Sequence, residues 1–175
     1  MPNKINKNSD ILARLLKENG NFPNHPEYPL LIYQHAFLLE GDDPASFIER
    51  HLKKNRWENL WRNGVLDHHH FHSNTHEVLA IYRGKALIIF GGPKGSEQAV
   101  KEGDVVILPA GTAHKLLQSE NNFACIGGYP FGKLYDMHKG EENKPEQIKR
   151  NIKEVRMPAY DPVYGEDGPL FEYWK

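Results

Sequence analysis

A chain of 175 residues with a formal net charge of −1 has room for one domain with a sizeable core and carries no positive excess. Its lysines and arginines are scattered, so we expect neither nucleic acid nor an anionic membrane surface as a partner. Cys125 is the only cysteine, and neither an apolar leader nor a bilayer-length apolar run is present, so we expect a cytoplasmic protein without disulfides.

Residues 1–63 are expected to form a helix-strand-helix extension. Three leucines share one helical face at 11–19, and Ser9 or Asp10 can cap the start of that helix. An apolar run bounded by turn residues predicts a strand at 30–39.

A second helix is predicted to begin at Asp43, with Pro44 in its first turn. Its apolar stripe would continue to Leu60 and Trp61, although the middle turn is polar. Trp57 and Trp61 would then lie on one helical face and pack in the core or at a dimer contact.

From Gly64 onward, the pattern changes to short apolar runs separated by turns, which predict strands at 77–90 (broken at Arg83), 97–100, 104–108, 113–118 and 123–129. This regular spacing is typical of an all-β sandwich or barrel. A polar helix or ordered loop is expected at 144–155, and the aromatic tail at 157–175 is expected to pack over the barrel.

Five of the ten histidines lie between positions 68 and 76. His70 and His72 are two apart, so on a strand both side chains point to the same face. A chain reversal after His72 would bring Glu77 beside them, and a Pro-Gly turn would bring in His114. Three imidazoles and one carboxylate leave coordination positions open on a transition-metal ion, which is typical of a catalytic metal.

These two segments resemble the two signature motifs of the cupin superfamily. The first motif matches at all of its fixed positions, and the second departs only at its last, where Gln118 replaces the usual Asn; the matching residues are Gly64, His70, His72, Glu77 and Gly84, then Gly103, Pro109, Gly111 and His114. Gln118 would lie roughly 13 Å beyond His114 along a strand, too far to share its ion.

The whole chain resembles the YjlB-like group of uncharacterised small bacterial cupins. The resemblance implies a cupin-type jelly-roll β-barrel with short N-terminal helices and an ordered C-terminal extension. It also implies a single cupin domain over 1–175, with its core at 64–130 and the extension at 131–175. The metal ligands that it implies are His70, His72, Glu77 and His114.

The remaining histidines of the run are weaker candidates. His68 shares the strand parity of His70 and could line the pocket as a base, whereas His69 and His76 should point away. In an alternative register, His72 and His76 would serve as ligands, but this spoils the spacing to the motif glycines. The whole cluster could also be hydrogen-bonded polar residues in a barrel that has lost its metal.

Four other residues could be assigned functional roles, but a structural role is the simpler explanation for each. Arg83 should lie at the far rim of the barrel, and Cys125 stands in an apolar strand where free cysteine usually packs in the core. Tyr33 and Tyr129 could line the pocket, although strand aromatics mostly pack.

We expect an enzyme that uses one divalent transition metal ion (Fe, Mn, Ni or Zn) on a small-molecule substrate. Two chemistries suit such a site: a dioxygenase-like reaction, or Lewis-acid isomerisation with Glu77 or His68 as the base. The alternative is a non-catalytic sensor or storage barrel, and a vestigial structural site is less favoured. A homodimer is expected, joined through the strand at 30–39 and the tail.

Overall fold

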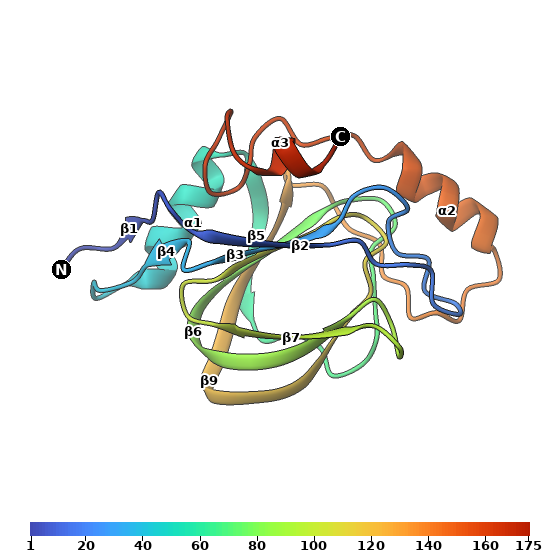
Figure 1. The fold of residues 1–175 in the computed structure, drawn as a ribbon, viewed down its shortest axis with the longest axis horizontal. Coiled ribbons are helices and arrows are strands. Elements are labelled where there is room, and N and C mark those ends of the chain that lie inside the picture. The colour runs from blue at the N-terminus through green and yellow to red at the C-terminus, as the bar shows by residue number, and fades with distance from the viewer.

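The computed structural model describes residues 1–175 and is built mainly from strands (Figure 1). Its elements, in chain order, are β1 (Lys4–Ile5), β2 (Asp10–Arg14), β3 (Leu30–Gln34), β4 (Phe37–Leu38), α1 (Pro44–Lys54), β5 (Trp57–Asn63), β6 (Glu77–Phe90), β7 (Ser96–Lys101), β8 (Val105–Leu108), β9 (His114–Pro130), α2 (Pro145–Glu154) and α3 (Leu170–Tyr173). None of the helices is long and apolar enough to cross a membrane.

The long strands β6 and β9 organise the fold by pairing antiparallel along almost their whole length. The first half of β6 also pairs with β8 and its second half with β7, on the edge opposite β9. The sheet runs in the order β2-β3-β8-β6-β9-β5, and it curls into the jelly-roll barrel of Figure 1. Its end strands β2 and β5 do not pair with each other, so the barrel remains open.

The central strands are buried on both faces, which explains their nearly continuous apolar sequence. On β3, Leu30 and Ile32 face the barrel interior with Leu79, whereas Leu31 and Tyr33 face outward. The outer face is covered by α1 and the C-terminal extension, which contribute Ile48, Leu52, Val163, Leu170 and Trp174. The predicted ordered extension is therefore confirmed.

The predicted helix at 11–19 is wrong. Residues Asp10–Arg14 form β2, which pairs with β3 in a register that sets Ile11 opposite Tyr33. The leucine spacing suited a helix, but the open edge of β3 supplies backbone hydrogen-bond partners, and this tertiary pairing outweighs a weak local propensity.

The second helix begins as predicted, because the Asp43 side chain accepts a hydrogen bond from the Ser46 N–H (3.1 Å). It ends at Lys54, and Trp57 and Trp61 then lie on β5 rather than on a helix, so that part of the prediction is wrong. A bulge between Glu58 and Trp61 turns the two rings to opposite faces. Trp57 donates to the Tyr160 carbonyl under the C-terminal extension, whereas Trp61 faces inward.

The helix-strand-helix description of 1–63 is consequently replaced by five strands and one helix. No structural boundary separates them from the core, since β3 pairs with β8 and β5 with β9. Within the predicted strand at 30–39, β3 offers no exposed edge to a dimer partner, because β2 and β8 occupy its two sides.

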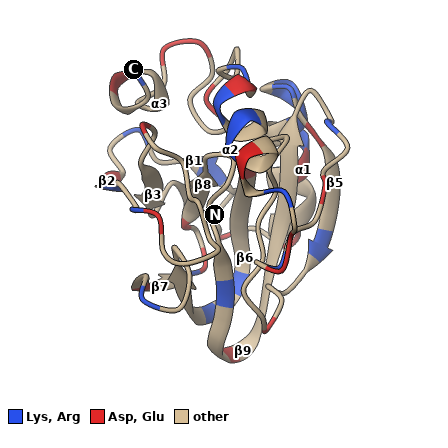
Figure 2. Ribbon diagram, turned by 90° about the vertical axis from the view of Figure 1, so that its right-hand side faces the viewer, with Lys and Arg blue, Asp and Glu red and all other residues tan.

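The predicted strands beyond residue 76 are confirmed, with two differences: 77–90 is one continuous strand without the expected break at Arg83, and 113–118 and 123–129 merge into β9. The polar helix at 144–155 is confirmed as α2. Figure 2 shows both basic and acidic residues on α2, which agrees with the balanced charge of the sequence.

Candidate metal centre

Three of the predicted ligands converge at one end of the barrel interior. Glu77 Oε2 lies 3.3 Å from Nε2 of His72 and 3.3 Å from Nε2 of His114. One ligand atom from each of the three residues lies within 4.8 Å of the others, and all three side chains are buried. Segments about forty residues apart in the chain thus meet as the motif spacing predicted.

Local backbone structure brings these segments together. His70 and His114 form an antiparallel bridge, with N–H to carbonyl distances of 3.2 and 3.0 Å. The Gly111 N–H donates to the His72 carbonyl (2.7 Å) from a turn in which Gly111 has φ +87°. The positive φ favours glycine here, and a Cβ on Gly111 would also lie 3.0 Å from the Asn24 carbonyl oxygen, so a larger residue would be strained and crowded.

Hydrogen bonds fix which nitrogen of each histidine faces the centre. Nδ1 of His72, His114 and His70 lies against the carbonyls of Asp136 (2.5 Å), Thr112 (3.0 Å) and His68 (2.9 Å). A carbonyl oxygen only accepts, so Nδ1 carries the hydrogen in each neutral ring and Nε2 is left with a bare lone pair.

His70 lies beside the other three residues rather than within their closest group. Its ring centroid is 4.0 Å from that of His114 and 6.1 Å from that of His72, and it lines the same cavity. The structure therefore places the fourth predicted ligand at the edge of the cluster.

Charge in the cluster is concentrated on Glu77. Burial alone would raise the pKa of this carboxyl group, but His72 and His114 more than offset that effect, and the pKa falls below its ordinary value. For His72, burial is likewise outweighed by the Glu77 carboxylate, which raises the pKa of the imidazole. Burial and the neighbouring His114 lower the pKa of His70 to about 3.

The donor set fits a divalent transition metal ion. Glu77 Oε2 is buried and has no hydrogen-bond partner, although a buried carboxylate oxygen normally has one. In the neutral rings, the nitrogens around it are acceptors, and a cation between these facing lone pairs and the carboxylate would relieve their repulsion. Imidazole and carboxylate together suit iron, manganese, nickel and zinc.

A cavity of about 260 Å³ opens onto the cluster. Its walls are mainly apolar and aromatic, with Trp61, Val65, Leu66, Leu79, Tyr135 and Met137. Tyr129 also lines it, as the sequence allowed, and donates a hydrogen bond to Glu77 Oε1 (3.2 Å). Tyr33 does not, since it donates to Asp161 on the outer face of the sheet (2.6 Å).

Trp61, Tyr135 and Met137 are among the lining residues that the sequence did not predict. Reading β5 as a strand would not have found Trp61, because a period-two pattern puts it on the same face as Trp57 and the bulge between Glu58 and Trp61 breaks that pattern. Tyr135 and Met137 lie in the loop after β9, for which the sequence offers no periodic signal. Tyr135 stacks on Tyr129, with ring centroids 4.8 Å apart, and lies equally close to His72.

The other candidate histidines lie outside the cavity. His68 stands behind His70, with ring centroids 5.5 Å apart and a side chain 42% exposed, so the cavity offers no support for its role as a base. His76 points away, as expected. Its Nδ1 accepts from the Ala110 N–H (2.9 Å) and its Nε2 donates to the Arg156 carbonyl (3.1 Å), which rules out the register that used it as a ligand.

The remaining candidates are structural, as the simpler explanations predicted. Arg83 is exposed and donates to the Asn122 carbonyl (2.8 Å). Cys125 is fully buried, and burial raises the pKa of its thiol. Gln118 lies on an exposed stretch of β9 opposite Leu87, away from the cluster.

Comparison with known proteins supports the same grouping. A family model described as "Cupin" matches residues 57–128. "Uncharacterized protein YjlB" of Bacillus subtilis is 43% identical over 157 residues, covering 90% of this chain and 92% of that protein.

Among solved structures, the Mycobacterium tuberculosis rmlC epimerase is 11% identical, with a TM-score of 0.45, and the match covers 83% of this chain and all of that one. Pumpkin seed globulin is 15% identical, with a TM-score of 0.38; the match covers 57% of this chain, which spans about a third of the globulin (32%). Likenesses this weak carry no argument about function. From the family match and the close relative, the chain belongs to the cupin family, in the group of Bacillus subtilis YjlB.

Proposed function

We propose that this protein is a metal-dependent enzyme in which His70, His72, Glu77 and His114 hold one divalent transition metal ion. The observation that carries the proposal is the buried Glu77 Oε2, which lacks a hydrogen-bond donor and faces two imidazole nitrogens at the cavity. A bound ion would supply Lewis acidity and, if it is iron or another redox metal, electrons for chemistry with dioxygen.

The cavity walls indicate the class of substrate. Apart from Glu77, the only charged side chain on the lining is Arg62, whose guanidinium is already bound by both oxygens of Glu49 (2.7 and 2.9 Å). No free cation therefore remains for a phosphate or a strongly anionic group. The substrate that fits is a small neutral or weakly acidic molecule with an apolar or aromatic body and oxygen atoms directed at the cluster.

The side chains around the cluster orient and shield the reacting region. Burial raises the pKa of Tyr129, so its hydroxyl stays protonated and remains a donor to Glu77. Trp61 Nε1 donates to the same hydroxyl (2.9 Å) and fixes its position. Tyr135 covers Tyr129 and His72 and limits the access of water.

Of the two chemistries, the dioxygenase-like one suits this lining better. The titratable side chains on it are the four cluster residues, two tyrosines and Arg62, so no carboxylate or imidazole outside the cluster is available as a base. A reaction that needs a side chain to abstract a carbon-bound proton is therefore disfavoured. Oxidation of an enol, phenol or diketone, which is already acidic, has no such requirement.

The test begins with protein purified without a nickel column and loaded with Fe(II). Oxygen uptake is measured with flavonols, diketones, thiols and sugar phosphates. We expect uptake with an apolar enol or diketone, none with sugar phosphates, and loss of uptake in His72→Ala. Metal-dependent binding of these compounds without turnover would contradict the enzyme and indicate a sensor or storage barrel.

A further inference from the structure

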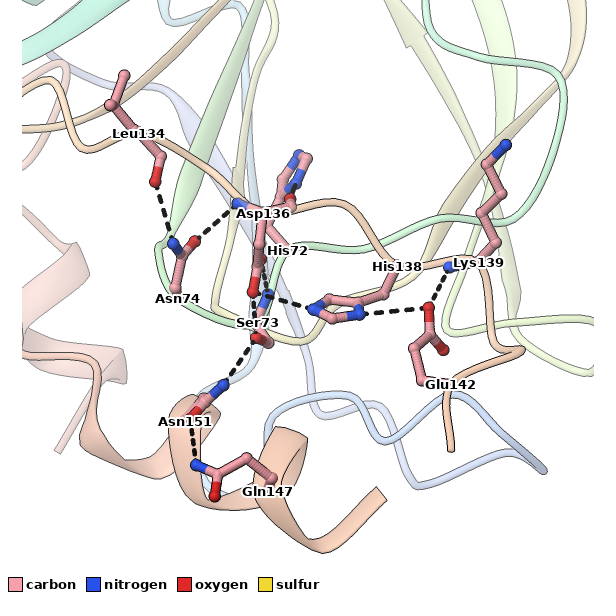
Figure 3. Close-up of polar contacts among 10 residues, drawn as sticks. All are labelled: His72, Ser73, Asn74, Leu134, Asp136, His138, Lys139, Glu142, Gln147 and Asn151. Atoms are coloured by element: carbon pink, nitrogen blue, oxygen red, sulfur yellow. Dashed lines mark hydrogen bonds and ion pairs between the residues drawn. The ribbon is translucent and has the colours of Figure 1, made fainter. Parts of the chain in front are cut away.

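The loop that follows β9 returns to the ligand-bearing segment and contacts it directly (Figure 3). The backbone carbonyl of Asp136 accepts the Nδ1 hydrogen of His72 at 2.5 Å. Two residues later, His138 exchanges both backbone hydrogen bonds with Phe71, each 3.0 Å long. The loop therefore forms an isolated β-bridge with Phe71 and lies beside His72.

The Asp136 side chain accepts hydrogen bonds from Ser73, the residue that follows the candidate ligand His72. Its Oδ1 accepts from the Ser73 backbone N–H (2.6 Å), and its Oδ2 accepts from the Ser73 hydroxyl (2.5 Å) and from His138 Nε2 (2.9 Å). One residue thus holds His72 through its carbonyl and Ser73 through its carboxylate. Hydrogen bonds to a carboxylate are roughly twice as strong as neutral ones.

Neighbouring side chains form further polar contacts with Asp136, Ser73 and His138. Asn74 accepts from the Asp136 N–H (3.1 Å) and donates to the Leu134 carbonyl (3.0 Å). Asn151, on α2, donates to the Ser73 hydroxyl (3.3 Å). On the far side, His138 Nδ1 lies 3.2 Å from Glu142 Oε1. Figure 3 shows these contacts running from the loop to α2.

This geometry has a consequence for the metal centre. An imidazole ring can present either nitrogen, and a ring free to rotate would offer Nε2 to an ion only part of the time. The Asp136 carbonyl selects the orientation of His72, but only while the loop stays against Ser73. Partners of this kind typically change metal affinity by 10–100-fold when they are removed.

We propose that Asp136 is a positioning residue for the metal centre, anchoring the loop to Ser73 so that its own carbonyl locks His72 with Nε2 toward Glu77. The same anchor places Tyr135, the preceding residue, against His72 and Tyr129 as a wall of the cavity. This role rests on the metal centre proposed above.

The test compares four proteins by titration of the metal-free chains with Co²⁺ and Zn²⁺. Asp136→Ala removes the anchor and keeps the carbonyl, so we expect affinity to fall 10–100-fold and the visible absorption spectrum of bound Co²⁺ to shift. Asp136→Asn retains an oxygen that can accept from Ser73 and should recover affinity to within about fivefold. Asp67→Ala is the matched control, because this nearby aspartate is 93% exposed, and it should bind as the wild type does.

Four outcomes separate the explanations. Wild-type affinity and spectrum in Asp136→Ala would overturn the role of Asp136 while leaving the metal centre intact. An unstable Asp136→Ala that still binds as the wild type does would show a purely structural role. If that variant does not fold, Ser73→Ala serves instead, with a smaller loss of affinity expected and an unchanged affinity contradicting the proposal. A wild-type chain that binds neither ion would refute the metal centre itself, and this role with it.

Discussion

His72 and His114 face the cavity, whereas His25 and His76 lie beneath the C-terminal extension, and the two pairs are equally buried. In the cavity pair, only Nδ1 has a partner in the protein, and Nε2 points at a carboxylate oxygen. In the covered pair, Nδ1 accepts from backbone N–H groups: Ala110 for His76, and Glu27 and Tyr28 for His25.

The covered pair also differs from the cavity pair in its surroundings, because its rings pack against aromatic side chains. The His76 ring packs 4.8 Å from Trp174, and His25 stacks on Tyr28 at 4.3 Å with the planes almost parallel. Burial lowers the pKa of His76 to about 3, so this ring stays neutral and fills the core. Burial therefore does not distinguish a ligand from a core histidine. The free lone pair does: Nε2 keeps one in His72 and His114, whereas in His25 and His76 the Nδ1 lone pair accepts from backbone N–H groups.

The largest expected effect comes from truncating one member of each pair. His114→Ala should lower metal affinity at least 100-fold while changing the free energy of unfolding of the metal-free protein by less than about 1 kcal/mol. His76→Ala should do the opposite, because it leaves the buried Ala110 N–H without its acceptor and opens a cavity beside Trp174. We expect a loss of about 3 kcal/mol with metal affinity unchanged within threefold.

Urea unfolding of the metal-free proteins and titration with Zn²⁺ measure the two quantities separately. The comparison fails if His76→Ala loses the metal while keeping its stability, or if His114→Ala binds as the wild type does.

A smaller effect concerns the pH dependence of stability. Burial lowers the pKa of His25 from 6.5 to about 4. Between these values the unfolded chain binds more protons than the folded one, so the stability from neutral His25 is complete above pH 6.5 and is lost as the pH falls toward 4. His25→Asn keeps an acceptor for the two N–H groups and removes the titration, so it should flatten the slope by somewhat less than about 1.4 kcal/mol per pH unit.

Urea unfolding at pH 7, 6, 5 and 4 measures that slope. An identical slope in the wild type and His25→Asn would show that the ring is protonated without cost, and that the covered pair does not depend on neutral histidines.

The convergence of the candidate ligands was predictable because motif spacing constrains the backbone strongly. His70 and His72 share a strand face, and the Pro-Gly turn before His114 has few conformations. The identity of β2 and β5 was not predictable in this way. Leu12 and Leu16 fit a helical face, and only the open edge of β3 makes a strand the better state. For Trp61, a β-bulge that has no signal in the sequence moves the ring to the inner face of the sheet.

The loop after β9 shows where prediction from sequence ends. Asp136 and Tyr135 reach His72 from about 60 residues further along the chain, through a backbone carbonyl and a ring stack. A carbonyl contact leaves no residue-type signal, and the loop has no periodicity to place it. Such contacts follow from the tertiary fold and cannot be predicted from local sequence pattern.

The most direct test of the metal centre is anomalous diffraction from crystals of the protein loaded with Zn²⁺ or Fe²⁺. A peak should stand about 2.0–2.3 Å from Nε2 of His72, Nε2 of His114 and an oxygen of Glu77, with His70 completing the set. A fully loaded crystal without a peak there, or with Glu77 Oε2 hydrogen-bonded to a protein donor instead, would contradict it.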